Sequence, residues 1–185
     1  FLEGVKNLLK KDAIFIFEQP NFTKGVLSLK FDQIYHEHIS YFTVRNIKSL
    51  LKHSGLKMIS INKNGYHGGS LRTIATNSNS KLKEFNAKKL IDFENKNKIY
   101  SHKFYKEMMK KINIKKINLL DKLIKLTQNG YLISGIGAGA KSNTFLTFYG
   151  LNNIIIKFLT DSSKFKKNKY TPITRIIIKD DKELS

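Results

Sequence analysis

The feature that most constrains the fold is a glycine-rich stretch, YLISGIGAGAKSNTFLTFYGL, at residues 131–151. Its apolar start, its alternating glycines and its apolar end predict a strand, a tight turn and a helix in direct succession. The following run IIIKFLTD, residues 154–161, predicts a second strand that ends at Asp161. Strands that alternate with helices in this way indicate an α/β domain with a parallel sheet.

The turn in this stretch matches the pattern G-x-G-x-x-A at residues 135–140, with which dinucleotide-binding domains hold a pyrophosphate. Gly137 belongs to a turn that brings backbone amides close to a phosphate, and Lys141 and Asn143 could add charge and hydrogen bonds. Asp161, about 20 residues on, could bind a ribose hydroxyl. One interpretation of this region is therefore an NAD-type oxidoreductase domain that acts on a sugar nucleotide.

A second α/β pattern occupies residues 1–79. Apolar spacing predicts a helix within residues 1–11, and AIFIFEQP, residues 13–20, has the continuous hydrophobicity of a buried parallel strand. Residues 44–53 predict another helix, and LKMISIN and SLRTIAT alternate like two strands around NGYHGG. This order fits the end of a class I methyltransferase domain, and also other α/β folds.

Residues 80–129 are highly charged and show helical periodicity, with a break near residues 95–98 that predicts two helices. We expect this segment to be a helical linker without chemistry. Residues 130–185 would then form a second, incomplete Rossmann-like domain. Both ends of the chain look cut, because neither sheet pattern is complete, and we expect a fragment of a longer protein.

The composition limits the class of protein. The chain has 185 residues, 41% of them hydrophobic, and no cysteine, so it can bury a core but has neither disulfides nor thiolate metal sites. It contains no apolar run long enough to span a membrane and no signal-peptide pattern at its start, so we expect a cytoplasmic protein.

The net charge is +20, from 34 basic and 14 acidic residues. Only Arg45, Arg72 and Arg175 are arginines, and they do not cluster with aromatic residues as in a base-reading surface. We interpret the charge as solvated lysine and expect neither a nucleic-acid nor a membrane partner. An anionic small molecule such as a nucleotide diphosphate would also suit a basic chain.

The stretch FDQIYHEHISYF, residues 31–42, places His36 and His38 around a glutamate. A zinc site would need a third ligand, such as His67, and the spacing is not that of a helical metal motif. A polar turn with its tyrosines packed on the core is another interpretation. Proton transfer is favoured, because an imidazole titrates near neutrality and a neighbouring carboxylate and phenol can orient it.

The hairpin connection contains His67, Gly68, Gly69 and Ser70. Paired glycines allow a close approach of backbone to a ligand, and the histidine and serine could donate hydrogen bonds. A glycine pair is also common in an ordinary hairpin turn.

Taken in order, FDQIYHEHISYF, YHGGSLR, GIGAGAKSNTFLTFYGL and KFKKNKYTPITRIII strongly resemble the SAM-dependent nucleotide-sugar C-methyltransferases. The resemblance covers nearly all of the chain. It implies the C-terminal part of a SAM-methyltransferase domain in residues 1–79, and a Rossmann-like platform for a TDP-sugar in residues 130–185. The implied reaction removes a proton next to the keto group of a TDP-linked 4-keto-deoxysugar, and the enolate attacks the methyl group of SAM.

By this resemblance His38 is the base, although His36 stays an alternative, and Tyr35 and Glu37 give it polar support. His67 and the Gly68-Gly69 turn, with Ser70, shape the wall of the substrate site. The remaining expected substrate contacts are Gly137, Lys141, Asn143, Lys164 and Tyr170.

The chain also departs from the family pattern. Ile173 and Ile177 stand where the family tends to have a glycine and a second proline, which affects the shape of that loop. The resemblance also implies an N-terminal zinc-binding module with cysteine ligands and a glycine-rich loop that binds SAM. Both would lie upstream of Phe1. We therefore expect SAM to bind mostly outside these residues, zinc to bind only upstream, and this chain to be inactive alone.

Overall fold

The computed structural model describes residues 1–184, and the side chain of His67 lies outside that description. The chain divides into two compact units. Unit 1 comprises Phe1–Lys30 and Ser40–Glu107, and unit 2 comprises Phe31–Ile39 and Met108–Ser185. The segment that carries the YHEH motif is thus grouped with the C-terminal residues, although the sequence pattern assigned it to residues 1–79.

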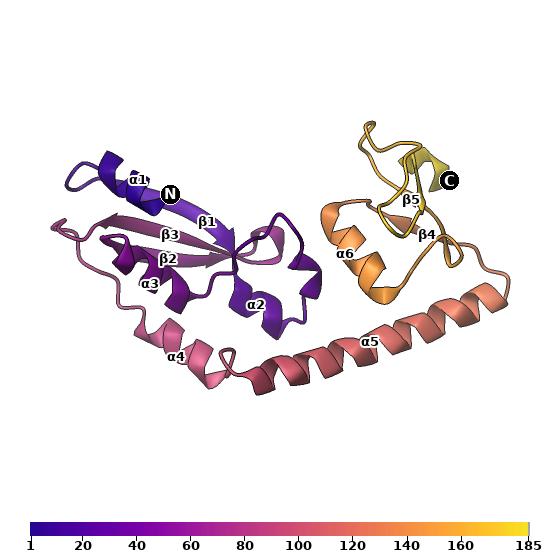
Figure 1. The fold of residues 1–185 in the computed structure, drawn as a ribbon, viewed down its shortest axis with the longest axis horizontal. Coiled ribbons are helices and arrows are strands. Elements are labelled where there is room, and N and C mark those ends of the chain that lie inside the picture. Colours follow the sequence, from indigo (N-terminus) through magenta and orange to yellow (C-terminus); the bar gives the residue numbers. More distant parts are fainter. Residues whose placement is uncertain (185) are drawn as a thin grey trace. The chain divides into compact units, whose positions relative to one another are not determined.

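Unit 1 is built on a three-stranded sheet in the order β1-β3-β2, with β3 antiparallel to both neighbours (Figure 1). Its strands are β1 (Ile14–Pro20), β2 (Leu56–Asn64) and β3 (Ser70–Asn77). The hairpin predicted from the alternating runs around NGYHGG is confirmed.

The prediction of a buried parallel strand at AIFIFEQP is wrong. β1 pairs with β3 in the antiparallel direction, and alternate residues are exposed, Ile14 by 49% and Ile16 by 53%. Phe15 and Phe17, on the opposite face, pack against the core of unit 1. A continuous apolar run therefore did not indicate burial on both faces, because helices cover only one of them.

The α-helices of unit 1 that precede His102 are α1 (Leu2–Leu8), α2 (Phe22–Leu27), α3 (Val44–His53) and α4 (Lys88–Lys96). Residues of α1, α3 and α4 pack into the core beside the sheet. The predicted helix at residues 44–53 is confirmed: Thr43 caps it by accepting a hydrogen bond from Asn46 N at 3.2 Å. Ile47 and Leu51 of α3 pack with Met58 and Leu71 of the sheet, which ties the helix to the hairpin.

Glu94 attaches α4 to the start of α3. Its carboxylate is 2% exposed and accepts hydrogen bonds from Val44 N at 2.8 Å, Thr23 Oγ1 at 3.0 Å and Tyr100 Oη at 2.6 Å. Burial, and next the bond to Glu94, raise the pKa of Tyr100 to about 12. The long helix α5 (His102–Gln128) follows after a break, as the sequence predicted.

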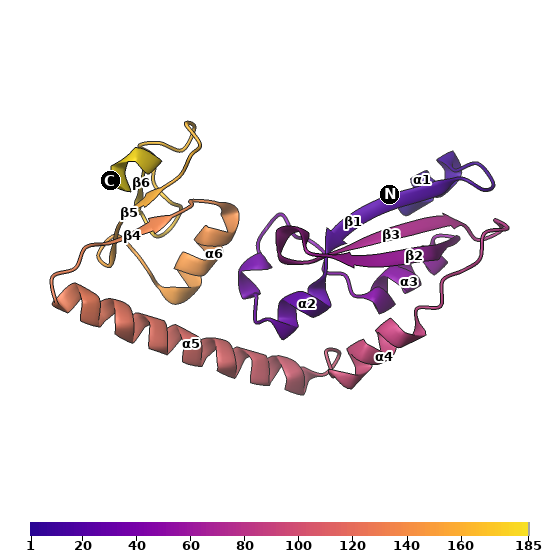
Figure 2. The same cartoon turned by 180° about the vertical axis from the view of Figure 1, so that it is seen from behind.

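Unit 2 contains a three-stranded parallel sheet in the order β4-β5-β6 (Figure 2). Its elements are the 3-10 helix η1 (Phe31–Gln33), β4 (Ile133–Ile136), α6 (Ala140–Tyr149), β5 (Ile156–Thr160), β6 (Ile177–Lys179) and η3 (Asp181–Leu184). The predicted succession of strand, turn, helix and strand is confirmed, and the chain is of mixed α/β class. The Rossmann-like assignment stays a prediction. Within residues 1–184, no helix has the length and apolar character needed to cross a bilayer.

Candidate functional site

The YHEH segment forms a tight turn that brings two side chains together. His38 N–H donates to the Tyr35 carbonyl at 3.0 Å, directly after η1. The rings of Tyr35 and His38 lie with centroids 4.4 Å apart, and the Tyr35 hydroxyl is 3.2 Å from His38 Nε2. Both residues are half-buried, so the pair is partly shielded from water and still accessible.

A backbone carbonyl fixes the protonation pattern of the neutral His38 ring. Nδ1 lies 2.9 Å from the Gln33 carbonyl oxygen. A carbonyl only accepts hydrogen bonds, so Nδ1 carries the hydrogen and Nε2 holds the free electron pair. The Tyr35 hydroxyl then donates to Nε2. The basic nitrogen of His38 is therefore Nε2.

His36 and Glu37 occupy the exposed tip of the same turn. Their side chains are 84% and 64% exposed, and His36 Nε2 lies 4.0 Å from Glu37 Oε1. Glu37 is thus placed beside His36, whereas Tyr35 and the Gln33 carbonyl contact His38. Sequence reasoning did not identify the Gln33 carbonyl, because a backbone group has no signature in the sequence.

The HGGS motif lies in unit 1, at the tip of the β2–β3 hairpin, where Tyr66–Gly68 form the short helix η2. Gly68 and Gly69 have φ values of 86° and 127°, which side chains other than glycine rarely adopt. Their amides donate to the carbonyls of Gly65 and Tyr66. Lys30 Nζ donates to the Gly68 carbonyl at 3.3 Å. The predicted role of His67 concerns a side chain outside the described residues.

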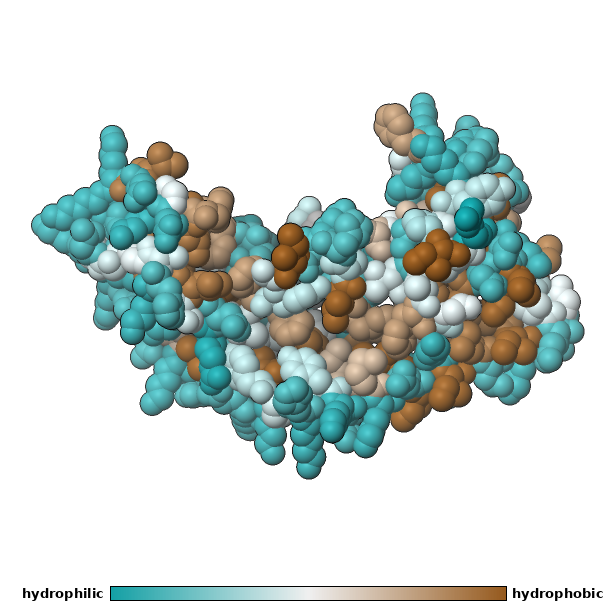
Figure 3. All heavy atoms as spheres, in the orientation of Figure 1, coloured by the Kyte–Doolittle hydropathy of each residue, from teal (hydrophilic) through white to brown (hydrophobic). Residues whose placement is uncertain are grey.

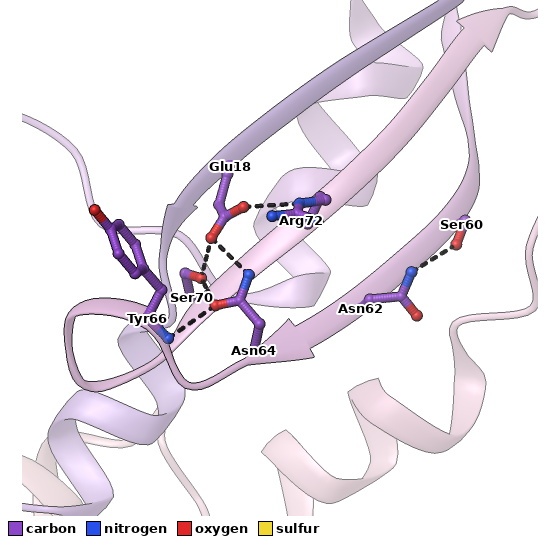
Figure 4. A network of polar contacts seen from close by, with 7 residues as sticks. All are labelled: Glu18, Ser60, Asn62, Asn64, Tyr66, Ser70 and Arg72. Atoms are coloured by element: carbon purple, nitrogen blue, oxygen red, sulfur yellow. Dashed lines mark hydrogen bonds and ion pairs between the residues drawn. The ribbon is translucent and has the colours of Figure 1, made fainter.

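Ser70 belongs to a polar network on the sheet (Figure 4). It is 5% exposed, and its hydroxyl contacts Glu18 and Asn64. Asn64 Oδ1 accepts from Tyr66 N at 3.0 Å, and Arg72 Nε donates to Glu18 at 2.8 Å. Hydrogen bonds from Ser70, Asn64 and Arg72, in that order, lower the pKa of Glu18 to about 2. The network connects all three strands and fixes the start of the HGGS turn.

The glycine-rich turn of unit 2 is bonded to Asp161. Ala138 N–H and Ser163 N–H each donate to the Asp161 carboxylate at 2.9 Å, and Lys166 Nζ lies 2.9 Å from it. The bond from Lys166, and next the Ser163 amide, hold the pKa of Asp161 below its usual value. An amide that could meet a phosphate, and the acid that could meet a ribose, are bonded to each other in this structure.

The other predicted nucleotide contacts are distributed over two cavities of unit 2. Asn143 and Tyr170 line a cavity of about 190 Å³, together with Lys166 and Lys169. Gly137 and Lys141 line a larger, mostly apolar cavity of about 470 Å³ under α5. Lys164 is exposed and lines neither cavity. Lys166 and Lys169 were missed, although they lie in the lysine-rich run KFKKNKY that the sequence showed.

Among the described side chains of residues 1–184, which do not include His67, no three histidine, aspartate or glutamate side chains converge on a metal site. We assign no residue of this chain to the zinc that the family resemblance places upstream.

Comparison with known proteins decides the family. Residues 65–185 match the family model described as the C-methyltransferase C-terminal domain. This chain belongs to the C-methyltransferase family. A curated relative, the C-methyltransferase NovU of Streptomyces niveus, is 27% identical over 179 residues. These residues are 96% of this chain and 42% of the relative, so the chain spans less than half of that protein.

Membership in this family supports a methyltransferase role. The matched residues include the HGGS turn from Gly65 onward, the glycine-rich turn and α6. Three of the four ordered motifs that suggested the family, YHGGSLR, GIGAGAKSNTFLTFYGL and KFKKNKYTPITRIII, therefore lie inside the matched segment.

Proposed function

We propose that this chain is part of an enzyme that moves a methyl group from SAM to the carbon next to the keto group of a TDP-linked 4-keto-deoxysugar. His38 removes a proton from that carbon, and the resulting enolate attacks the methyl group while the bond between methyl and the sulfur of SAM breaks, which releases S-adenosylhomocysteine. The observation that carries the proposal is the hydrogen bond from His38 Nδ1 to the Gln33 carbonyl at 2.9 Å. It leaves Nε2 as a base within a half-buried turn.

The Tyr35–His38 pair suits a base that gains and loses a proton. A carbon acid next to a ketone needs a base that titrates near neutrality, as imidazole does. When His38 is neutral, the Tyr35 hydroxyl donates to Nε2; when Nε2 is protonated, the hydroxyl can accept instead. The Gln33 carbonyl accepts from Nδ1 in both states. The substrate proton reaches Nε2 either after the hydroxyl turns away or through that hydroxyl.

SAM supplies the electrophilic methyl group in such a reaction. In the glycine-rich turn, the amide of Ala138 is bonded to Asp161 and is therefore not directed at a ligand. We therefore assign no residue of this chain to SAM. We propose that Asn143 and Tyr170 contact the nucleotide of the substrate, since they share a cavity with Lys166 and Lys169, whose charge suits a diphosphate.

The proton step can be measured separately from methyl transfer. In the full-length protein, without SAM, the carbon next to the ketone should exchange its hydrogen for deuterium in D₂O, which NMR detects. We expect His38→Ala to slow this exchange at least about 100-fold, since general-base catalysis contributes roughly that factor or more. His36→Ala is the matched control and should keep the exchange rate. Tyr35→Phe should abolish exchange only if the hydroxyl relays the proton.

An unchanged rate of deuterium exchange in His38→Ala would rule out His38 as the base.

A titration with TDP and NAD tests the substrate class. We expect the 185 residues alone to bind TDP without transferring methyl groups. Tight NAD binding that is lost in Asp161→Ala would instead favour an oxidoreductase.

A further inference from the structure

Phe31 joins the YHEH segment to α6 within unit 2. Its ring lies among three aromatic rings of α6, with centroids 4.4 Å from Phe148, 5.9 Å from Tyr149 and 6.4 Å from Phe145. These rings also contact one another, Phe145 and Tyr149 being stacked at 4.3 Å. Phe31 is therefore the side chain that packs η1 against the aromatic cluster of α6.

The same short helix carries the carbonyl that fixes the His38 ring. η1 consists of Phe31, Asp32 and Gln33, and the Gln33 carbonyl accepts from His38 Nδ1 at 2.9 Å. Ile34 N–H donates to the Phe31 carbonyl at 2.9 Å and closes the turn. Phe31 and Gln33 lie only two residues apart in η1. The packing of the Phe31 ring on α6 therefore constrains the direction of the Gln33 carbonyl.

We propose that Phe31 is a positioning residue that holds His38 in the state with Nε2 as the base. The chain of contacts runs from the aromatic rings of α6 to Phe31, through η1 to the Gln33 carbonyl, and from there to Nδ1. The inference rests on the proposed function only in taking His38 as the base; the contacts themselves do not depend on the reaction.

The physical reason is that a three-residue 3-10 helix is too short to keep its shape unaided. Without the ring of Phe31, η1 would lose its packing on α6 and the Gln33 carbonyl would no longer face Nδ1. A neutral imidazole without that acceptor can place its hydrogen on either nitrogen. A fraction of His38 would then carry the hydrogen on Nε2 and could not accept a proton there.

The state of His38 can be read directly by NMR. In the chain labelled with ¹⁵N histidine, at alkaline pH where imidazoles are neutral, we expect Nδ1 of His38 to appear protonated and Nε2 unprotonated. Phe31→Ala should move both signals toward a mixture of the two tautomers, and Phe31→Leu should restore most of the original pattern. His36, exposed in the same turn, is an internal control and its signals should stay.

Matched variants separate positioning from general loss of stability. Phe165→Ala removes a phenylalanine of unit 2 that is 86% exposed and should leave His38 unchanged. Ile178→Val weakens the same core of unit 2 on β6, outside η1 and α6, and should also leave the tautomer unchanged. If Phe31→Ala does not fold, Phe148→Leu replaces the partner ring nearest to Phe31 and should shift the His38 signals in the same direction. Unchanged His38 signals in a folded Phe31→Ala or Phe148→Leu would overturn the proposal.

The activity readout distinguishes this proposal from the assignment of the base. In the full-length protein, Phe31→Ala should lower the rate of deuterium exchange about 100-fold, the effect of a small misplacement of a catalytic group, while TDP affinity is unchanged. A shifted tautomer with an unchanged exchange rate would contradict the positioning role. Failure of His38→Ala to slow exchange would reject His38 as the base, but the NMR result would still decide whether Phe31 holds its ring.

Discussion

Glu18 illustrates how single residues stabilise the hairpin of unit 1. Its carboxylate accepts hydrogen bonds from Arg72 and Asn64 and contacts the Ser70 hydroxyl (Figure 4). Ser70 was predicted to face the substrate, but its hydroxyl is directed into this network. The three donors favour the charged form of Glu18, which is why its pKa falls to about 2.

This shift predicts a pH-dependent contribution to stability. The pKa of Glu18 is lowered from 4.5 to about 2 in the folded state, so its contribution is present above pH 4.5 and is lost as the pH falls through 2. We expect Glu18→Gln to be less stable than the wild type at neutral pH, with the difference shrinking in this window. Urea unfolding at a series of pH values measures it.

Asp92→Asn is the control for this prediction, because Asp92 is an exposed carboxylate on α4. It should leave the unfolding midpoint nearly unchanged at neutral pH. A difference between the wild type and Glu18→Gln that stays constant down to pH 2 would contradict the role of the network.

At the scale of elements, local patterns located most helices and strands, but not how the strands pair. The run AIFIFEQP suggested a parallel strand, whereas β1 is antiparallel to β3. Strand direction and the coverage of each face depend on which segments meet, and no local run of residues contains that information. The hairpin was predictable because both strands and their turn are adjacent in the sequence.

The turn of that hairpin allows a matched pair of substitutions. Gly68 has a φ of 86°, whereas Gly65 has a φ of −85° and open space where a Cβ would be placed. We expect Gly68→Ala to destabilise unit 1 by about 1–2 kcal/mol, the usual cost of a left-handed conformation. Gly65→Ala should be neutral or stabilise by up to about 1 kcal/mol. Thermal unfolding compares them, and equal effects would contradict the backbone argument.

For the whole molecule, the dominant property is its charge of +20. Hydrophilic residues cover much of the face seen in Figure 3. Several of the 14 acidic side chains are engaged with lysine or arginine, as in the Glu18–Arg72 and Asp161–Lys166 pairs. The excess of lysine therefore remains largely as solvated surface, apart from the cavity lined by Lys166 and Lys169.

We therefore expect only weak, non-specific binding to nucleic acid. Binding to a random DNA duplex should weaken steeply with added salt, because it depends on counterion release, and should be weak at about 150 mM salt. Fluorescence anisotropy over a salt series measures the slope. Tight binding to one sequence that survives this salt concentration would contradict the interpretation of the charge.

The sequence alone determined the succession of elements and the ordered motifs that indicated the C-methyltransferase family, because both are local patterns of residue type. The tertiary structure decided how the motif residues are used. The Gln33 carbonyl fixes the tautomer of His38. The Ser70 hydroxyl contacts the carboxylate of Glu18, 52 positions away in the sequence, and the Asp161 carboxylate accepts a hydrogen bond from the amide of Ala138, 23 positions away. Such pairings follow from folding, which brings distant segments together, so the residue types alone could name the participants but not their partners.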